Sequence, residues 1–383
     1  MKKSALALAV AASLVGFGSA AYADTTLYGS GRVSVDYDER NSNYVEVDGQ
    51  LVRIQAGSDA WDVYNNASRL GVRGEEDLGG GLSAIYQYEF GVDVTEGGNF
   101  GSNRPKWIGL KGNSWGSVTA GTQWTPYYNV VGIGDIFNSS KAFDTDTYLG
   151  NTFALRMDNS LIYSSPNWSG FGFQAMLVMN GSCPPSDPEV TSDLCTQPGA
   201  ADNRLPSNLS NDIDMWNLSM SYKNGPFFAG ATYMALEGPN LGDDVISGVD
   251  VPTLPNWEGD QWAVAFGYNS GPFAVTLSYE QGDVNTLYRG DGESLYLTGQ
   301  YTFGNNVIRG AYGYTSADEG QYSDIVNDTL VRLTQSDINN YILGYQYNFS
   351  KRTRLWVEYI GQDVDSELVG NRQTVSIGTR HDF

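Results

Sequence analysis

Histidine and cysteine are scarce in this chain, and the spacing of its carboxylates does not suit enzymatic chemistry. Its single histidine, His381, lies two residues from the end, whereas acyl-transfer enzymes hold a histidine base beside a nucleophile. Glu75 and Glu76 are consecutive, so on a strand their carboxylates point to opposite faces and cannot act as a pair. No run of acids has the spacing of a calcium loop. We therefore expect no enzymatic activity, no cofactor and no protein metal site, while bridging of lipopolysaccharide by divalent ions stays open.

The two cysteines, Cys183 and Cys195, lie in one stretch that is rich in turn residues. In an oxidising compartment they are predicted to close a loop disulfide, with two free thiols as the alternative. The whole chain carries a formal net charge of −22. Because phosphate binding needs clustered Lys and Arg, this acidity argues against a nucleic-acid partner.

The first 23 residues have the organisation of a secretory signal peptide. Lys2 and Lys3 precede an apolar run over 5–17, and a small-residue cleavage site ends at Ala23. The run is shorter than the roughly 20 residues that a spanning helix needs, which makes an anchoring helix the weaker reading. We therefore predict a signal peptide over 1–23 and a mature domain over 24–383.

Residues 261–280, QWAVAFGYNSGPFAVTLSYE, alternate between apolar and small or polar side chains on both sides of a tight turn. A period of two indicates strands, and the short reversal indicates an antiparallel hairpin. The apolar face is large and aromatic, as expected where a strand meets lipid and its interfaces. A chain with no long apolar helix can cross a membrane only as a closed barrel.

The same alternation recurs along the whole mature chain. It predicts sixteen strands, near 25–37, 68–74, 82–93, 105–111, 117–123, 157–165, 171–180, 213–223, 226–237, 260–269, 272–283, 293–303, 306–315, 338–349, 352–361 and 371–383. Short turns alternate with long polar connections such as 38–67, 124–156, 181–212 and 238–259, which is the topology of outer-membrane barrels. The even number places both termini on the periplasmic side.

In each strand the residues that alternate with the apolar ones are largely polar. We therefore expect them to face inward and the barrel to enclose water. A barrel of this strand number is too wide for side chains to fill. Tyr296 and Ile342 break the inward pattern, and the sequence offers no reason for either. We therefore predict an all-β, sixteen-stranded antiparallel transmembrane barrel in the bacterial outer membrane.

Four separated motifs give the chain a family resemblance. SRLGVRGEEDLGGGL (68–82), GTQWTPYY (121–128), RMDNSLIYSSPNWSGFGF (156–173) and SIGTRHDF (376–383) resemble the general trimeric porins of Gram-negative bacteria, of the neisserial and comamonad type. The resemblance implies a homotrimer that passes ions and small hydrophilic solutes passively and uses no cofactor. It also implies that the third external loop folds into the pore, and that Phe383 belongs to the signal read by the barrel-assembly machinery.

The resemblance also implies a pore constriction with an acidic and a basic side. The third long connection, 124–156, would present Asp135, Asp144 and Asp146, unless it is a solvated external loop. The opposing wall would carry arginines, for which the inward-parity residues Arg32 and Arg69, together with Arg156 at the start of a strand, are the candidates.

The remaining arginines are harder to place. Arg73 is expected to form an ion pair with Glu75 or Glu76 beside a turn. Arg354, Arg372 and Arg380 share inward parity, but the sequence does not give their depth.

Ion preference and cargo are the least constrained expectations. Thr122 stands where the family often has an arginine, so the basic wall is expected to be thin and the channel weakly cation-preferring or nearly neutral. Trp107, Trp124 and Tyr127, with Tyr128 and Tyr148, could form part of a luminal aromatic ladder. A channel selective for a sugar, an oligosaccharide or phosphate is therefore the alternative to a general porin.

Overall fold

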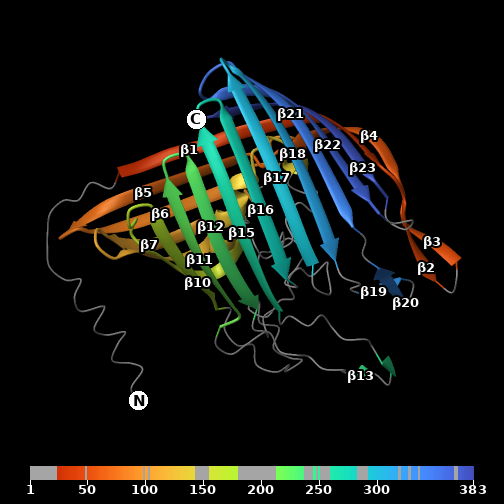
Figure 1. Ribbon diagram of the computed structural model, residues 1–383, viewed down its shortest axis with the longest axis horizontal. Coiled ribbons are helices and arrows are strands. Elements are labelled where there is room, and N and C mark those ends of the chain that lie inside the picture. The colour runs from red at the N-terminus through yellow and green to blue at the C-terminus, as the bar shows by residue number, and fades with distance from the viewer. Residues whose placement is uncertain are drawn as a thin grey trace.

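The wall of the molecule is one closed antiparallel sheet, seen from the side in Figure 1. The computed structural model describes residues 24–47, 50–97, 100–101, 104–142, 155–179, 213–236, 245–246, 249–250, 259–282, 292–317, 321–326, 329–334, 337–365 and 370–383. Each of the sixteen predicted strand ranges coincides with a strand of this sheet. The wall strands are β1 (Asp24–Arg40), β4 (Ser58–Asn65), β5 (Arg69–Gly79), β6 (Leu82–Gly91), β7 (Lys106–Gly112), β8 (Gly116–Trp124), β9 (Arg156–Ser164), β10 (Phe171–Val178), β11 (Met215–Asn224), β12 (Phe227–Leu236), β15 (Gly259–Ser270), β16 (Phe273–Gly282), β17 (Gly292–Phe303), β18 (Asn306–Ala317), β21 (Ile338–Asn348), β22 (Thr353–Val364) and β23 (Arg372–Asp382).

The barrel closes where the first strand meets the last. One edge of β1 pairs with β23, and its other edge pairs with β5 and then with β4 further along. Because β4 and β5 follow one another along β1, they form a single wall strand, and sixteen strands encircle the lumen. The two halves are separated by residues 66–68, where Ala67 has a φ of 59°. The predicted sixteen-stranded antiparallel barrel is confirmed.

The first long connection contains more structure than the sequence pattern indicated. Residues 38–67 were expected to be a loop, but they include β4 and the hairpin of β2 (Asn43–Val47) and β3 (Gln50–Gln55). The acids in SDAWDVYN hide the alternation of β4 in the sequence, because they make both parities look polar. Two further hairpins lie in long connections, β13 (Val245–Ile246) with β14 (Val249–Asp250) and β19 (Gln321–Val326) with β20 (Thr329–Thr334).

The two faces of the wall differ as the alternation predicts. On β15 the side chain of Phe266 is 56% exposed, whereas its neighbour Ala265, on the other face, is fully buried. The same holds around the barrel, where Met220, Leu343 and Ile377 are at least half exposed. These apolar side chains do not pack into a sealed interior, so they form an apolar exterior. Among the described residues, no helix is both long and apolar enough to cross a bilayer.

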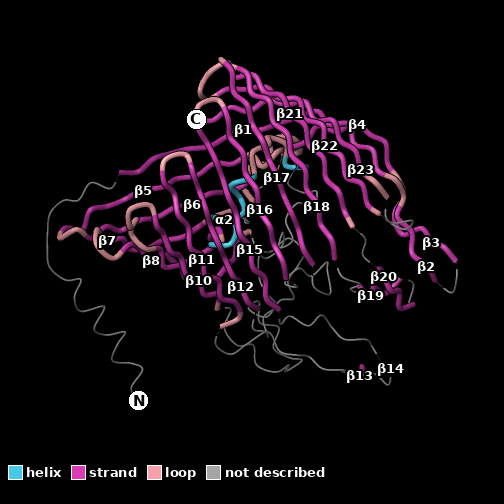
Figure 2. The backbone as a smooth tube through the Cα atoms, viewed as in Figure 1, coloured by secondary structure: helices cyan, strands magenta, loops and turns pink. Residues whose placement is uncertain are grey.

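Part of the inner wall is apolar, and a loop covers it. After β8 the chain forms α2 (Pro126–Val131), then the short helices η1 (Gly132–Gly134) and η2 (Ser140–Ala142). In the view of Figure 2, α2 (cyan) lies level with the strands rather than beyond their ends. Tyr127 and Val131 of α2 pack on inward-facing apolar residues of neighbouring strands, which are Met157, Ile162, Met176, Val178, Met215, Met234, Leu236, Ala263 and Tyr296.

This covered platform explains both exceptions to the inward polar pattern. Tyr296 belongs to the group of apolar residues beneath α2 and η1, and it is 3% exposed. Ile342 packs with Ile360 and with Ala142 of η2 in a second buried group, against which Phe137 rests. Apolar residues therefore face inward where residues 126–142 exclude water from the wall.

Candidate functional site: a charged constriction inside the barrel

The loop of residues 125–142 is attached to the wall at two places. The first is helix α2, which has favourable N-terminal capping residues. The hydroxyl of Thr125 caps the helix by accepting a hydrogen bond from the amide of Tyr128 at 3.0 Å, and Pro126 follows at the first helical position. Tyr127 is fully buried. Its amide donates to Asn217 Oδ1 at 2.7 Å, and its hydroxyl donates to Glu280 Oε2 at 2.8 Å. These bonds join α2 to strands β11 and β16.

The second anchor is a buried carboxylate on β22. Glu358 is 1% exposed and accepts the amide of Asn138 on Oε1 and the amide of Ser139 on Oε2, each at 2.8 Å. Nearby, Lys141 Nζ lies 3.2 Å from a carboxylate oxygen of Asp36, and both residues are buried. The loop is therefore held on both sides of residues 128–137 by bonds to inward-facing wall residues.

Between the two anchors the loop faces a cavity with a volume of about 470 Å³. Five arginines line it, namely Arg32, Arg69, Arg104, Arg156 and Arg380, and Asp135 lines it from the loop. The cavity thus brings together four of the residues that the sequence singled out for a constriction, which are Arg32, Arg69, Arg156 and Asp135. Their roles in conduction stay predictions.

Strand register concentrates positive charge on one side of this cavity. Arg32 on β1 pairs directly with Arg380 on β23, which in turn pairs with Arg354 on β22. Asp382 offsets part of the repulsion between these arginines, because its carboxylate forms salt bridges with Arg354 and with Arg380. The distance from Arg380 Nε to Asp382 Oδ1 is 2.7 Å. Arg32 Nε donates to the hydroxyl of Ser30 at 3.1 Å. Three neighbouring strands thereby present a row of guanidinium groups to the lumen.

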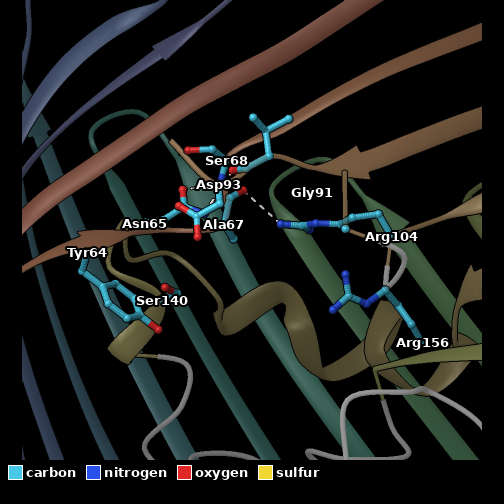
Figure 3. A pocket seen from close by; sticks show the side chains of 11 residues that line it. Tyr64, Asn65, Ala67, Ser68, Gly91, Asp93, Arg104, Ser140 and Arg156 are labelled. Carbon is cyan, nitrogen blue, oxygen red and sulfur yellow. Dashed lines mark hydrogen bonds between the residues drawn. The ribbon is translucent and has the colours of Figure 1, made fainter. Parts of the chain in front are cut away.

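One of the arginines that line the cavity, Arg104, lies outside the regular strands. Arg104 donates to the carbonyl of Ala67 at 3.0 Å, and both Arg104 and Arg69 lie within 3.7 Å of Glu89. Figure 3 shows Arg104 and Arg156 pointing toward a second cavity, of about 350 Å³, that both residues line. Burial lowers the pKa of Arg104 to about 10, with the neighbouring arginines acting in the same direction, so the side chain stays protonated at neutral pH. Sequence reasoning missed Arg104 because it stands in an irregular stretch without parity.

On the loop side, an aromatic pair supports the acid. The hydroxyl of Tyr128 donates to Asp135 Oδ2 at 2.7 Å, and burial followed by the charge of Asp135 raises the pKa of this phenol. The ring of Tyr128 stacks on Trp124 with 4.6 Å between centroids. The guanidinium of Arg156 covers Trp124, 4.7 Å from its ring centroid. Asp135 and Arg156, which line the same cavity, are therefore linked through these two aromatic rings.

Other predicted residues lie elsewhere. Trp107 on β7 is half-buried and has inward parity, opposite to the exposed Ile108. Asp144, Asp146, Tyr148, Cys183 and Cys195 fall outside the described residues, as does the predicted signal peptide. Phe383 exchanges two backbone hydrogen bonds with Gly29, both at 3.1 Å, at the closure of the barrel.

Arg73 differs from expectation. Its guanidinium lies over the ring of Tyr28, 5.2 Å from the centroid, while Glu75 receives Lys111 Nζ at 3.1 Å. The expected ion pair between Arg73 and Glu75 is replaced by one between Lys111 and Glu75. Glu75 on β5 and Lys111 on β7 both point to the luminal face, where the lysine reaches the carboxylate. In the part of the chain that the structure describes, no group of three or more His, Cys, Asp or Glu residues could hold a metal ion.

A closed sheet with an apolar exterior and a charged cavity on its inner side defines an outer-membrane channel. The model of the Gram-negative porin family matches residues 5–366, and the chain belongs to that family. It is 26% identical over 373 residues to a major outer membrane protein P.IB of Neisseria gonorrhoeae, covering 92% of this chain and 91% of the relative. The protein is therefore an outer-membrane porin, a channel and not an enzyme.

Solved structures share the fold. An anion-selective porin from Comamonas acidovorans superposes with a TM-score of 0.62 at 20% identity, covering 94% of this chain and all of the other. OmpT of Vibrio cholerae, described as a trimer form, gives a TM-score of 0.57 at 15% identity, covering 94% of this chain and 99% of the other. At these identities the likeness extends to the fold alone.

Proposed function

We propose that this porin passes small hydrophilic solutes through a throat between the arginine wall and residues 125–142, and that the throat prefers anions. The observation that carries the proposal is the single cavity lined by five arginines and Asp135. Glu89 and Asp382 offset part of that positive charge through their contacts with the arginines. The throat keeps an excess of positive charge.

The mechanism is passage through a transverse electric field. Guanidinium groups on one wall and the Asp135 carboxylate on the other face each other across a narrow aqueous gap, where low-dielectric walls focus the field. A polar solute can align its dipole with this field. An apolar solute gains nothing from the field and must displace oriented water, so passage favours hydrophilic solutes.

The proposed anion preference differs from the sequence-based expectation of a weakly cation-preferring or nearly neutral channel, which was drawn from Thr122. The basic positions that the sequence could not place, Arg104 and Arg380, add to the wall and make up for the absent arginine. The acidic external segments lie mostly outside the described residues. Because solvent-exposed charge is screened over about 8 Å at physiological ionic strength, we expect the charge that lines the throat to dominate selectivity in salt.

The proposed assembly is a homotrimer. At the barrel end that carries the short turns, exposed aromatic residues include Phe171 on β10, Phe227 on β12, Phe273 on β16 and Phe349 just after β21. On β1, β5 and β8 the outward positions there are small or aliphatic, including Leu27, Gly74, Val118 and Ala120. Interfacial aromatics mark contact with lipid. Tyr86 and Tyr88 nevertheless project outward on β6 of this sector. The proposed trimer is therefore supported by the family and by a solved relative described as a trimer form.

The other proposed partners follow from outer-membrane residence. Lipid and lipopolysaccharide surround the remaining sector, the barrel-assembly machinery reads the end of the chain at Phe383, and residues 1–23 are removed on export. The short-turn end faces the periplasm, and Cys183 and Cys195 form a disulfide in an external loop. A substrate-selective channel is less favoured because Tyr127 is buried under the loop and cannot contact a solute.

Reconstitution into planar bilayers tests the proposed function. We expect discrete conductance steps and, in a potassium chloride gradient, a reversal potential of anionic sign. Steps grouped in threes support the trimer. A cationic reversal potential would refute the anion-preferring throat, and the absence of conductance by folded protein would refute the aqueous path.

A further inference from the structure

The cavity of about 350 Å³ shown in Figure 3 adjoins the throat cavity, and we call it the side cavity. The two cavities share part of their lining, namely Ala67, Arg104, Ser140 and Arg156. The rest of the side cavity is lined by the ends of β4 and β6 and the residues that follow them, which are Tyr64, Asn65, Ser68, Gly91, Val92, Asp93 and Gly101. The volume falls within the range of about 300–1,000 Å³ that is usual for small-molecule sites.

Backbone contacts bring charged side chains of opposite sign to the same part of this lining. Arg104 donates to the carbonyl of Ala67 at 3.0 Å, and the next carbonyl, that of Ser68, accepts the amide of Val92 at 2.9 Å. Asp93 directly follows Val92 in the chain. In Figure 3, Asp93 and the guanidinium of Arg104 both lie beside Ala67. The break between β4 and β5 therefore positions both charges.

The neutral polar side chains of the lining are already bonded within the protein. The amide of Asn65 donates to the carbonyl of Val92 at 3.1 Å, and its oxygen accepts the backbone amide of Ser68 at 3.3 Å. The hydroxyls of Ser68 and Ser140 donate to acceptors of the wall at 3.1 and 3.3 Å. A solute in the side cavity therefore meets mainly the charged side chains.

Two guanidinium groups form the positive side of the side cavity. Arg156 makes no hydrogen bond or ion pair with the other described residues, and its guanidinium lies over the ring of Trp124. Burial lowers the pKa of Arg104, and the charges of Arg69 and Arg156 lower it further, so the two guanidinium groups of the lining repel each other. An anion between them relieves this repulsion, and guanidinium groups form charge-assisted hydrogen bonds with carboxylates.

Asp93 forms the negative side. Its Oδ1 accepts the amide and the hydroxyl of Thr95 at 2.9 and 2.8 Å, and the amide of Glu96 at 3.2 Å. The hydrogen bonds from Thr95, the backbone one first, lower the pKa of Asp93, so its carboxylate is ionised at neutral pH. Within the described part of the chain, no donor is bonded to Oδ2, and this oxygen can accept a cation.

We propose that the side cavity binds a free amino acid, a property that goes beyond the proposed function. The carboxylate of the amino acid lies between Arg104 and Arg156, and its ammonium group pairs with Asp93. A simple carboxylate lacks the second contact and is repelled by Asp93. An amine without a carboxylate lacks the first contact and is repelled by the arginines, so the zwitterion alone matches both signs of charge.

Saturation-transfer NMR titrations of the folded protein in detergent test the proposal. Alanine is the probe, and lactate, in which a hydroxyl replaces the ammonium group, is its control. Asp93→Asn weakens alanine binding about two- to fivefold, as for the loss of an exposed ion pair, and does not weaken lactate binding. Glu96→Gln is the matched control, because it removes the same charge from an exposed side chain outside the lining, and it leaves both affinities unchanged. Absence of alanine binding, or an equal loss of alanine affinity in the two variants, overturns the site.

Reversal potentials in planar bilayers give a second readout, because Arg104 and Arg156 also line the throat cavity. Alanine carries no net charge, yet its bound carboxylate covers part of the throat's positive charge and shifts the reversal potential toward the cationic sign. If Asp93→Asn does not fold, Arg156→Gln replaces it, and we expect it to weaken alanine and lactate alike; unchanged affinity for alanine overturns the site. An anionic reversal potential without alanine binding removes the site alone, whereas alanine binding without conductance removes the proposed function alone.

Discussion

The carboxylate of Glu358 should control the mobility of the loop that borders the throat. It accepts the amides of Asn138 and Ser139, one on each oxygen at 2.8 Å, and a third bond from the side chain of Asn138 at 3.1 Å. Glu358→Gln keeps the shape of the side chain but turns one acceptor oxygen into an amide donor. One backbone N–H of the loop then loses its partner in a buried position.

The structure sets the size of the effect. A hydrogen bond to a charged group contributes about 1.5–3 kcal/mol, and a buried donor left unpaired has a comparable cost. At about 1.4 kcal/mol per factor of ten, the ratio of docked to undocked loop falls roughly 10- to 150-fold. Tyr127 still holds α2 through Glu280 and Asn217, so undocking is confined to the residues near 138. We expect a barrel that assembles normally and a throat that fluctuates.

Single-channel recordings at constant voltage provide the assay. Wild type should show a quiet open channel, and Glu358→Gln should add fluctuations of the open-channel current. Glu75→Gln is the matched control, since Glu75 also has inward parity but forms an exposed pair with Lys111, and such pairs contribute little. Open-channel noise in Glu358→Gln equal to that of wild type and of the control would refute the anchoring role of this carboxylate.

Three further substitutions test the throat and the wall. Asp135→Asn should make the reversal potential more anionic, because it removes the acid opposite the arginines; no change would place this carboxylate outside the ion path. Arg104→Gln should lower the anion-to-cation permeability ratio about sixfold, since a unit charge at about 8 Å in water contributes roughly 0.5 kcal/mol to each ion, with opposite sign for anion and cation; an increased ratio would contradict the reasoning. Gly378→Val should prevent stable folding, because an added Cβ would lie 2.1 Å from the ring of Trp356, whereas Gly299→Val should fold normally. Heat-modifiable mobility in SDS gels distinguishes folded from unfolded barrel, and a heat-modifiable Gly378→Val would show that Trp356 can move aside.

The wall was predictable because strand alternation is imposed by lipid on one side and water on the other. Every strand that meets both solvents, such as β15 and β16, carries that period in its sequence. β4 escaped prediction because Asp59 and Asp62 have opposite parities, which removes the contrast between its faces. The two-residue period arises because lipid contacts one face of a strand and water the other. It is lost where the end of a strand extends beyond the hydrocarbon layer.

The constriction was predictable only in part, for two physical reasons. The alternation of side chains places Arg32 and Arg69 on the inner face, but it does not give their height along the barrel axis. The sequence therefore does not predict that they line one cavity with Arg380, or that Arg380 pairs with Asp382. Arg104 stands in an irregular segment, where no period applies. A usable signal did exist for the loop: inward-facing methionines on several consecutive strands indicate that something apolar covers that wall.

The central claim is that one parity of each strand faces lipid and the other faces a water-filled lumen. Met220 and Ser221 on β11 are consecutive and point to opposite faces, and Met220 is 63% exposed. Single cysteines at these positions, in a variant with Cys183 and Cys195 replaced by serine, can be exposed in planar bilayers to a charged, membrane-impermeant thiol reagent. We predict that Ser221→Cys reacts and changes the conductance, and that Met220→Cys does not react. Rapid modification of Met220→Cys, with Ser221→Cys protected, would contradict the account.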